Sequence, residues 1–237
     1  MSFYRPGLLR VAAFSLLLVA LPLIAQEKPP ANAYARANYT KHEFSIPMRD
    51  GAKLFTSVYV PKDRSQTYPI MLLRTPYSVS PYGLDQYRDT LGPSEHFMKD
   101  GFIVVYQDLR GRYMSDGVWT EVRPHNPAKN GPADADESSD TWDTIDWLVK
   151  NIPANNGKVG MWGISYPGFY VSAGMIDAHP ALVAASPQAP VTDYYLGDDS
   201  FHNGAFLLAH NFSFYVSFKP RVGGPAKPQP SPSFDWG

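Results

Sequence analysis

The sequence contains no cysteine. This absence excludes a disulfide framework, a thiolate zinc site and a cysteine nucleophile together. It does not decide the compartment, because many secreted bacterial-type proteins also lack cysteine. An excess of charge of either sign is missing too: the formal net charge is −1 and no run rich in lysine and arginine occurs. The charge pattern therefore argues against nucleic acid as a partner.

The hydrophobic content is sufficient for a folded domain. Of the 237 residues, 44% are hydrophobic and 14% are aromatic. This composition can bury one sizeable core and excludes disorder for the bulk of the chain. We expect neither a cofactor nor a metal ion.

The N-terminus indicates a compartment. Arg5 and Arg10 precede an apolar run, Val11–Ile24, which ends at Ala25. The run is shorter than the roughly 20 residues that a membrane-spanning helix needs. A basic start, a short apolar stretch and a small residue before polar sequence predict a secretory signal peptide over residues 1–25. The alternatives are an uncleaved anchor and a lipid-facing tether. With cleavage we expect a secreted or periplasmic protein without a stable membrane anchor.

Hydrophobic patterning predicts a parallel α/β sheet preceded by a β-hairpin around Asp50-Gly51. Short apolar runs predict buried strands at Ile70–Leu73, Phe102–Tyr106, Val159–Trp162 and Leu182–Ala185. Helical spacing predicts helices at Asp140–Asn151 and Tyr166–Ala178. The intervening stretch Arg112–Asp136 is irregular and long, so we expect it to be functional or mobile.

The strongest motif is Gly163-Ile164-Ser165-Tyr166-Pro167-Gly168. It follows a predicted buried strand and precedes a predicted helix, which is the setting of the nucleophile elbow in α/β-hydrolases. Its glycines allow strand and helix to approach closely, and the helix N-terminus favours a developing oxyanion. Ser165 is therefore the candidate catalytic nucleophile. The alternative is a glycine-rich turn with an ordinary N-capping serine.

An oxyanion hole needs two hydrogen-bond donors. The backbone N–H of Tyr166, directly after the nucleophile, is one candidate. The second donor usually comes from the loop after an earlier strand, which here is Arg74-Thr75-Pro76-Tyr77. The Tyr77 hydroxyl could serve, or Tyr77 could merely pack over the sheet.

These residues resemble one group of enzymes: the α-amino-acid ester hydrolases, cocaine esterase, the glutaryl-cephalosporin acylases and the X-Pro dipeptidyl-peptidases. The resemblance covers about Tyr39 to Val222 and rests on five motifs in the same order. They are Arg74-Thr75-Pro76-Tyr77, Asp108-Leu109-Arg110-Gly111, Asp143-Thr144-Ile145-Asp146-Trp147-Leu148, Gly160–Gly168 and Gly197-Asp198-Asp199-Ser200-Phe201-His202.

The resemblance implies a nucleophile at Ser165, with the Tyr77 hydroxyl and the Tyr166 N–H as oxyanion donors. The last motif most resembles the α-amino-acid ester hydrolases, in which a carboxylate cluster holds the substrate's ammonium group. Asp199 matches one member of that cluster. The alternative for Asp199 is a solvated loop or a helix cap before Ser200. The chain departs from the ester-hydrolase pattern at Pro167 and Ser200, which weakens the substrate assignment but not the reaction class.

The resemblance does not supply a triad base or acid within this chain. His179 is interpreted as structural, and neither His202 nor His210 is assigned as the base. Asp108 beside Arg110 is interpreted as a structural ion pair. His42, His96 and His125 precede the serine and fit the family's Ser, Asp, His order worse.

The chain is therefore interpreted as the N-terminal part of an α/β-hydrolase, truncated after the nucleophile elbow. We expect a signal peptide at 1–25, a linker at 26–38, the N-terminal part of the hydrolase domain at 39–200 and the start of a helical cap at 201–237. The family's C-terminal jelly-roll domain is absent from this sequence.

The predicted function is a secreted serine hydrolase that cleaves esters or amides of α-amino acids through an acyl-enzyme on Ser165, inactive as this fragment. The alternatives are an X-Pro dipeptidyl-peptidase or glutaryl-cephalosporin acylase activity, and a non-catalytic remnant or one part of a split protein. The partner is a small-molecule ester or amide, and the full-length protein could form a homo-oligomer.

Overall fold

A computed structural model describes residues 30–218 of the chain. The predicted signal peptide and the end of the predicted cap lie outside the described residues. In the part described, no helix is long and apolar enough to cross a membrane.

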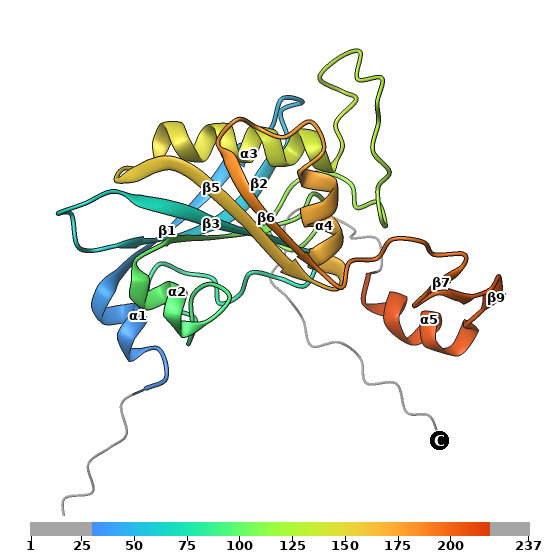
Figure 1. Cartoon of the computed structure of the whole chain (residues 1–237), viewed down its shortest axis with the longest axis horizontal. Coiled ribbons are helices and arrows are strands. Elements are labelled where there is room, and N and C mark those ends of the chain that lie inside the picture. Colours follow the sequence, from blue (N-terminus) through green and yellow to red (C-terminus); the bar gives the residue numbers. More distant parts are fainter. Residues whose placement is uncertain (1–29, 219–237) are drawn as a thin grey trace, which may run out of the picture. The chain divides into compact units, whose positions relative to one another are not determined.

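The centre of the fold is a six-stranded sheet with the order β1-β2-β4-β3-β5-β6 (Figure 1). Its strands are β1 (Tyr39–Pro47), β2 (Lys53–Pro61), β3 (Tyr68–Thr75), β4 (Ile103–Asp108), β5 (Asn155–Ile164) and β6 (Leu182–Gln188). The β1–β2 and β2–β4 pairs are antiparallel, whereas the remaining neighbours are parallel. The predicted hairpin, the four buried strands and the α/β class are thus confirmed.

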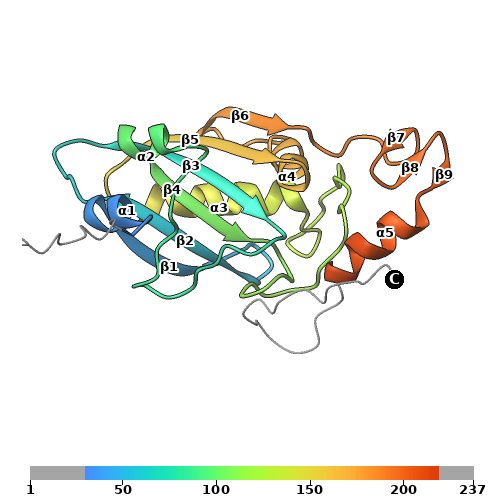
Figure 2. The same cartoon turned by 90° about the horizontal axis from the view of Figure 1, so that it is seen from below.

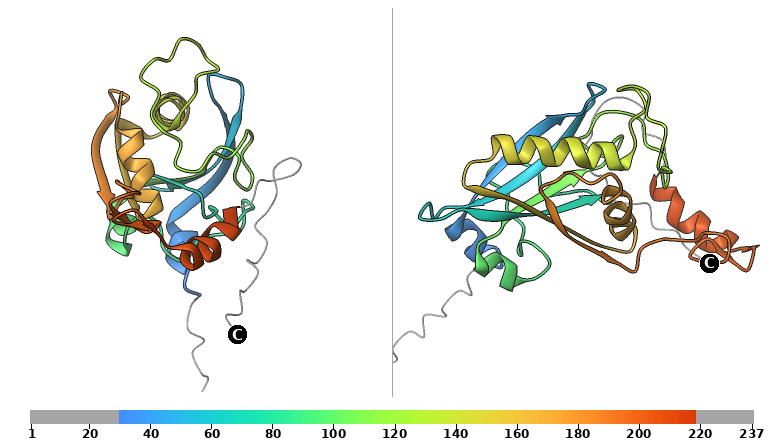
Figure 3. Two further views of the ribbon diagram at one scale, coloured as in Figure 1. Left: turned by 90° about the vertical axis from the view of Figure 1, so that its right-hand side faces the viewer. Right: turned by 45° about the horizontal axis from the view of Figure 1, so that its top comes forward.

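Helices cover both faces of this sheet. They are α1 (Ala33–Asn38), α2 (Glu95–Asp100), α3 (Glu137–Asn151) and α4 (Tyr166–Gly174). Figure 2 and Figure 3 show α3 and α4 along the sheet, with α1 and α2 on its other side. Strand β4 reflects this arrangement, because Ile103 and Val105 belong to one buried cluster and Val104 and Tyr106 to another. A strand covered on both faces is a continuous apolar run rather than an alternating one.

Two helices differ from their predicted limits. Helix α3 begins at Glu137, because Asp136 caps it and exchanges hydrogen bonds with Ser139 in a capping box. Helix α4 ends at Gly174, since the chain turns at Asp177, whose φ is +53°. Part of the segment interpreted as a linker is helical: α1 places Ala35 in the core. The domain limits themselves stay a prediction.

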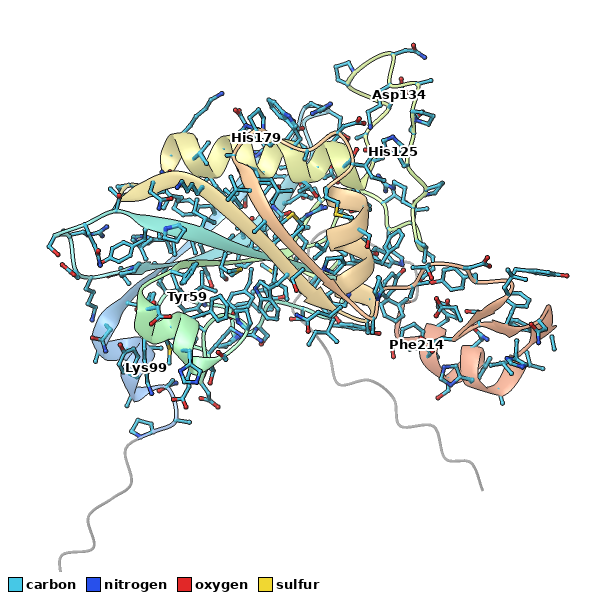
Figure 4. The ribbon with its side chains drawn as sticks, viewed as in Figure 1. Tyr59, Lys99, His125, Asp134, His179 and Phe214 are labelled. Atoms are coloured by element: carbon cyan, nitrogen blue, oxygen red, sulfur yellow. The ribbon has the colours of Figure 1, made fainter. Side chains whose placement is uncertain are left out.

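Beyond the sheet, the chain forms a small three-stranded hairpin followed by a helix. The elements are β7 (Gly197–Asp198), β8 (Phe201–His202), β9 (Ala205–Phe206), α5 (Leu208–Tyr215) and the 3₁₀ turn η1 (Val216–Phe218). The predicted cap thus begins with strands before its first helix. Figure 4 labels Phe214, which α5 contributes to the region described next.

Candidate active site

Ser165 occupies the sharp turn between β5 and α4. Its backbone has φ 61° and ψ −124°, a conformation that non-glycine residues rarely adopt. The Ser165 N–H donates to the carbonyl oxygen of Gln188 in β6 at 2.9 Å, and the residue is exposed. Among residues 30–218, the Ser165 hydroxyl has no hydrogen-bond partner. The turn therefore presents an unengaged hydroxyl above the ends of the parallel strands.

The two glycines of the motif are required by close approach. A Cβ on Gly163 would lie 2.3 Å from the carbonyl oxygen of Pro167, and one on Gly168 would lie 2.6 Å from that of Gln188. Both neighbours are backbone atoms and cannot move aside. Strand and helix meet at the distance that the elbow needs, and only glycine fits there.

Tyr77 lies on the loop after β3, next to Tyr166. The centroids of their rings are 6.3 Å apart, and the Tyr77 side chain is 44% exposed. Partial burial, with the nearby charges of Glu121 and Asp199, raises the pKa of Tyr77 to about 12. The phenol stays protonated at neutral pH and can donate a hydrogen bond, as an oxyanion donor must.

The side chain of Tyr166 is fixed by the long loop between β4 and α3. Its hydroxyl donates to Glu121 Oε1 and accepts from the Val122 N–H at 3.0 Å. Trp119 Nε1 donates to the other oxygen of Glu121 at 3.2 Å. The loop thereby holds the residue whose N–H is the candidate oxyanion donor. Sequence analysis missed Glu121, and only the unusual length of its loop pointed to this region.

A small cavity of about 40 Å³ joins Ser165 to the segment after β6. Its lining includes Ser165, Tyr166, Asp199, His210 and Tyr215. Asp199 is exposed, and its backbone N–H donates to Asp198 Oδ1 at 2.7 Å. The structure therefore brings the predicted nucleophile and the predicted ammonium-binding carboxylate to one cavity.

The histidines are distributed unevenly around this site. His210 lines the cavity of Ser165, whereas His202 lies exposed on β8. His179 packs edge-on against Trp142 with ring centroids 4.8 Å apart, and its Nδ1 accepts from the Ala181 N–H. These contacts suit the structural interpretation of His179. Within the described residues, no histidine hydrogen-bonds Ser165.

The predicted ion pair between Asp108 and Arg110 is wrong. Asp108 accepts from the Val79 N–H at 2.9 Å and from the Tyr82 hydroxyl at 2.8 Å, and so anchors the loop that carries Tyr77. Burial outweighs these hydrogen bonds and raises the pKa of Asp108 to about 7.

Arg110 turns the other way. Its guanidinium pairs with Asp140 of α3 at 2.6 Å and with Asp50 of the β1–β2 hairpin at 2.6 Å. Adjacent alternate positions of one loop thus have separate partners, because neighbouring elements approach the loop from different sides.

Over residues 30–218, no three histidine or acidic side chains come together as potential metal ligands. The site consists of a strained serine at a strand–helix turn, two candidate oxyanion donors and a carboxylate across a small cavity. On a mixed sheet with helices on both faces, this arrangement defines an α/β-hydrolase.

The comparisons with known proteins identify the family. Residues 50–229 match the model of the X-Pro dipeptidyl-peptidase (S15) family, and the chain belongs to that family. Cocaine esterase of Rhodococcus sp. (strain MB1 Bresler) is 31% identical over 150 residues, which are 63% of this chain and 23% of that protein.

Two solved structures are similar over most of the chain. An α-amino acid ester hydrolase is 38% identical with a TM-score of 0.70, covering 89% of this chain and 34% of its own. An aminopeptidase of a Thaumarchaeota archaeon is 37% identical with a TM-score of 0.68, covering 83% and 32%. The chain therefore spans about a third of these structures and about a quarter of its curated relative. The suspected family and the N-terminal position are confirmed.

Proposed function

We propose that this chain carries the nucleophile side of a serine hydrolase that cleaves esters or amides of α-amino acids. The observation that supports this most is the strained, exposed Ser165 in one cavity with Asp199. The family includes esterases and peptidases, and the similar α-amino acid ester hydrolase is consistent with this substrate class.

In the proposed reaction, Ser165 Oγ attacks the substrate carbonyl and forms an acyl-enzyme, which water then hydrolyses. Negative charge develops on the carbonyl oxygen. The Tyr166 N–H, at the first position of α4, and the protonated Tyr77 hydroxyl stabilise it. A base must take the serine proton, and no residue is assigned to that role.

Asp199 provides the proposed specificity for an ammonium group. We expect the chain to bind phenylalaninamide more tightly than 3-phenylpropanamide, which lacks the amine. Asp199→Asn should reduce that preference by about fivefold, the upper end for an exposed ion pair, and leave the binding of 3-phenylpropanamide unchanged. Isothermal titration calorimetry measures both affinities.

The matched control for this experiment is Asp89→Asn, which removes an exposed carboxylate on another loop. Equal weakening of both ligands by Asp199→Asn would show that Asp199 does not recognise the amine.

A dipeptidyl-peptidase activity is the second candidate, because the matching family model is that of X-Pro dipeptidyl-peptidase and one similar structure is an aminopeptidase. Glutaryl-cephalosporin acylase activity and a non-catalytic remnant complete the alternatives. Tighter binding of an X-Pro dipeptide amide than of phenylalaninamide would favour the peptidase.

We further propose export, on the basis of Arg5, Arg10 and the apolar run Val11–Ile24. The mature protein, expressed in a bacterial host, should begin at Gln26 and be recovered from the periplasm or medium. Mass spectrometry of the N-terminal peptide checks this. An intact Met1 to Gln26 segment on cytoplasmic protein would contradict it.

A further inference from the structure

Arg112 is a buried cation without an acidic partner. Its side chain belongs to a residue that is 8% exposed, and none of the ion pairs among residues 30–218 includes it. Its Nε donates to the Pro76 carbonyl at 3.1 Å, and its Nη2 donates to the Ser217 carbonyl at 3.3 Å and the Tyr113 hydroxyl at 3.4 Å. Every acceptor is therefore neutral.

Aromatic rings hold the guanidinium in place. Its central carbon lies 4.8 Å from the ring centroid of Phe218, 4.9 Å from that of Tyr113 and 5.3 Å from that of Trp119. Cation–π contacts and carbonyl dipoles reduce the cost of burying the charge. They do not supply the counter-charge that a buried guanidinium usually has.

Two acids are close enough to feel this charge but are engaged elsewhere. Asp108 accepts from Val79 and Tyr82, and Glu121 accepts from Tyr166 and Trp119. Burial raises the pKa of both carboxyls, which favours their neutral forms. Neither compensates Arg112 fully.

Arg112 faces a cavity that adjoins the active site. This second cavity has a volume of about 470 Å³, and its lining includes Tyr77, Arg112, His210, Phe214 and Ser217. His210 and Phe214 also line the cavity of Ser165. The two cavities therefore meet at these side chains, with the oxyanion candidate Tyr77 on the Arg112 side and Asp199 on the Ser165 side.

We propose that Arg112 is a substrate-binding residue for a carboxylate on the leaving group. The guanidinium fork matches a carboxylate, and its Nη1 makes no hydrogen bond within the described residues. Resting on the proposed function, this places the ammonium and the carboxylate of the substrate on opposite sides of the scissile carbonyl. The substrate class becomes α-aminoacyl compounds whose leaving group carries a carboxylate, of which a free dipeptide is the simplest.

The test compares two ligands that differ only in that carboxylate: phenylalanyl-alanine and its C-terminal amide. Calorimetry on the full chain should show that the acid binds at least about tenfold more tightly, as expected for charge-assisted hydrogen bonds. Arg112→Gln should abolish this preference and leave the affinity for the amide unchanged. Arg112→Lys should retain part of it.

Arg123→Gln is the matched control. Arg123 lies on the same loop and also donates to backbone carbonyls, those of Ala135 and Val118. This variant should keep the wild-type preference. If Arg112→Gln does not fold, the ligand pair still tests the proposal on the unaltered chain.

Equal binding of acid and amide by the wild type overturns the carboxylate site, as does an unchanged preference in Arg112→Gln or no binding of either ligand. Failure of the proposed amine recognition has a different signature. It abolishes the difference between phenylalaninamide and 3-phenylpropanamide and leaves the acid–amide difference intact.

Discussion

A fluorophosphonate probe should leave Ser165 unlabelled when the chain is purified by itself. A serine hydroxyl is a weak nucleophile until a base takes its proton. Among the described residues no histidine hydrogen-bonds Ser165, although its backbone has the strained conformation of a nucleophile. In serine-protease triads, loss of the base costs on the order of 10⁶ in kcat, and the oxyanion hole retains roughly 10³–10⁴ over water.

Mass spectrometry of the probe-treated chain measures the labelled fraction, with Ser165→Ala as the control for labelling elsewhere. Stoichiometric labelling that Ser165→Ala abolishes would contradict the expectation and show that a base is present. His210 would then be the first residue to replace, because it lines the cavity of Ser165 and His202 does not.

Replacing Arg110 by glutamine should lower the free energy of unfolding by about 3–5 kcal/mol. Arg110 is 6% exposed and bridges Asp140, which is fully buried, to Asp50. Removing the guanidinium leaves the Asp140 carboxylate buried with Arg74 Nη2 as its remaining cation, 3.9 Å away. The cost arises from the uncompensated charge more than from the lost attraction.

Urea unfolding followed by tryptophan fluorescence gives the free energies. Lys99→Gln is the matched control, since Lys99 forms an exposed ion pair with Glu95 across one helical turn. That variant should change stability by less than about 1 kcal/mol. A similarly small change for Arg110→Gln would mean that water or a protonated Asp140 compensates the missing charge.

The expected solubility of the isolated chain follows from the sheet edge. Strand β6 ends the described sheet, and its Val183 side chain is 62% exposed. An unpaired edge strand offers its N–H and carbonyl groups to other chains. We therefore expect the purified chain to associate, and both unfolding and labelling experiments need low protein concentrations.

The amino-acid pattern alone predicts the fold class and the position of the nucleophile. The apolar runs that became β3, β4, β5 and β6 are local signals, because a strand covered on both faces requires continuous hydrophobic residues. The elbow is equally local. Gly163 and Gly168 are needed where backbone meets backbone within a few residues, so their spacing around Ser165 already carries the geometry.

Only the tertiary structure decides what the charged residues after β4 do. Asp108, Arg110 and Arg112 are two positions apart, yet one anchors the Tyr77 loop, one bridges Asp50 to Asp140, and one lines a cavity. Irregular backbone has no periodicity from which a side chain's direction follows. Each partner is fixed by elements that are remote in sequence, and burial of the charge, rather than its neighbours along the chain, selects among them.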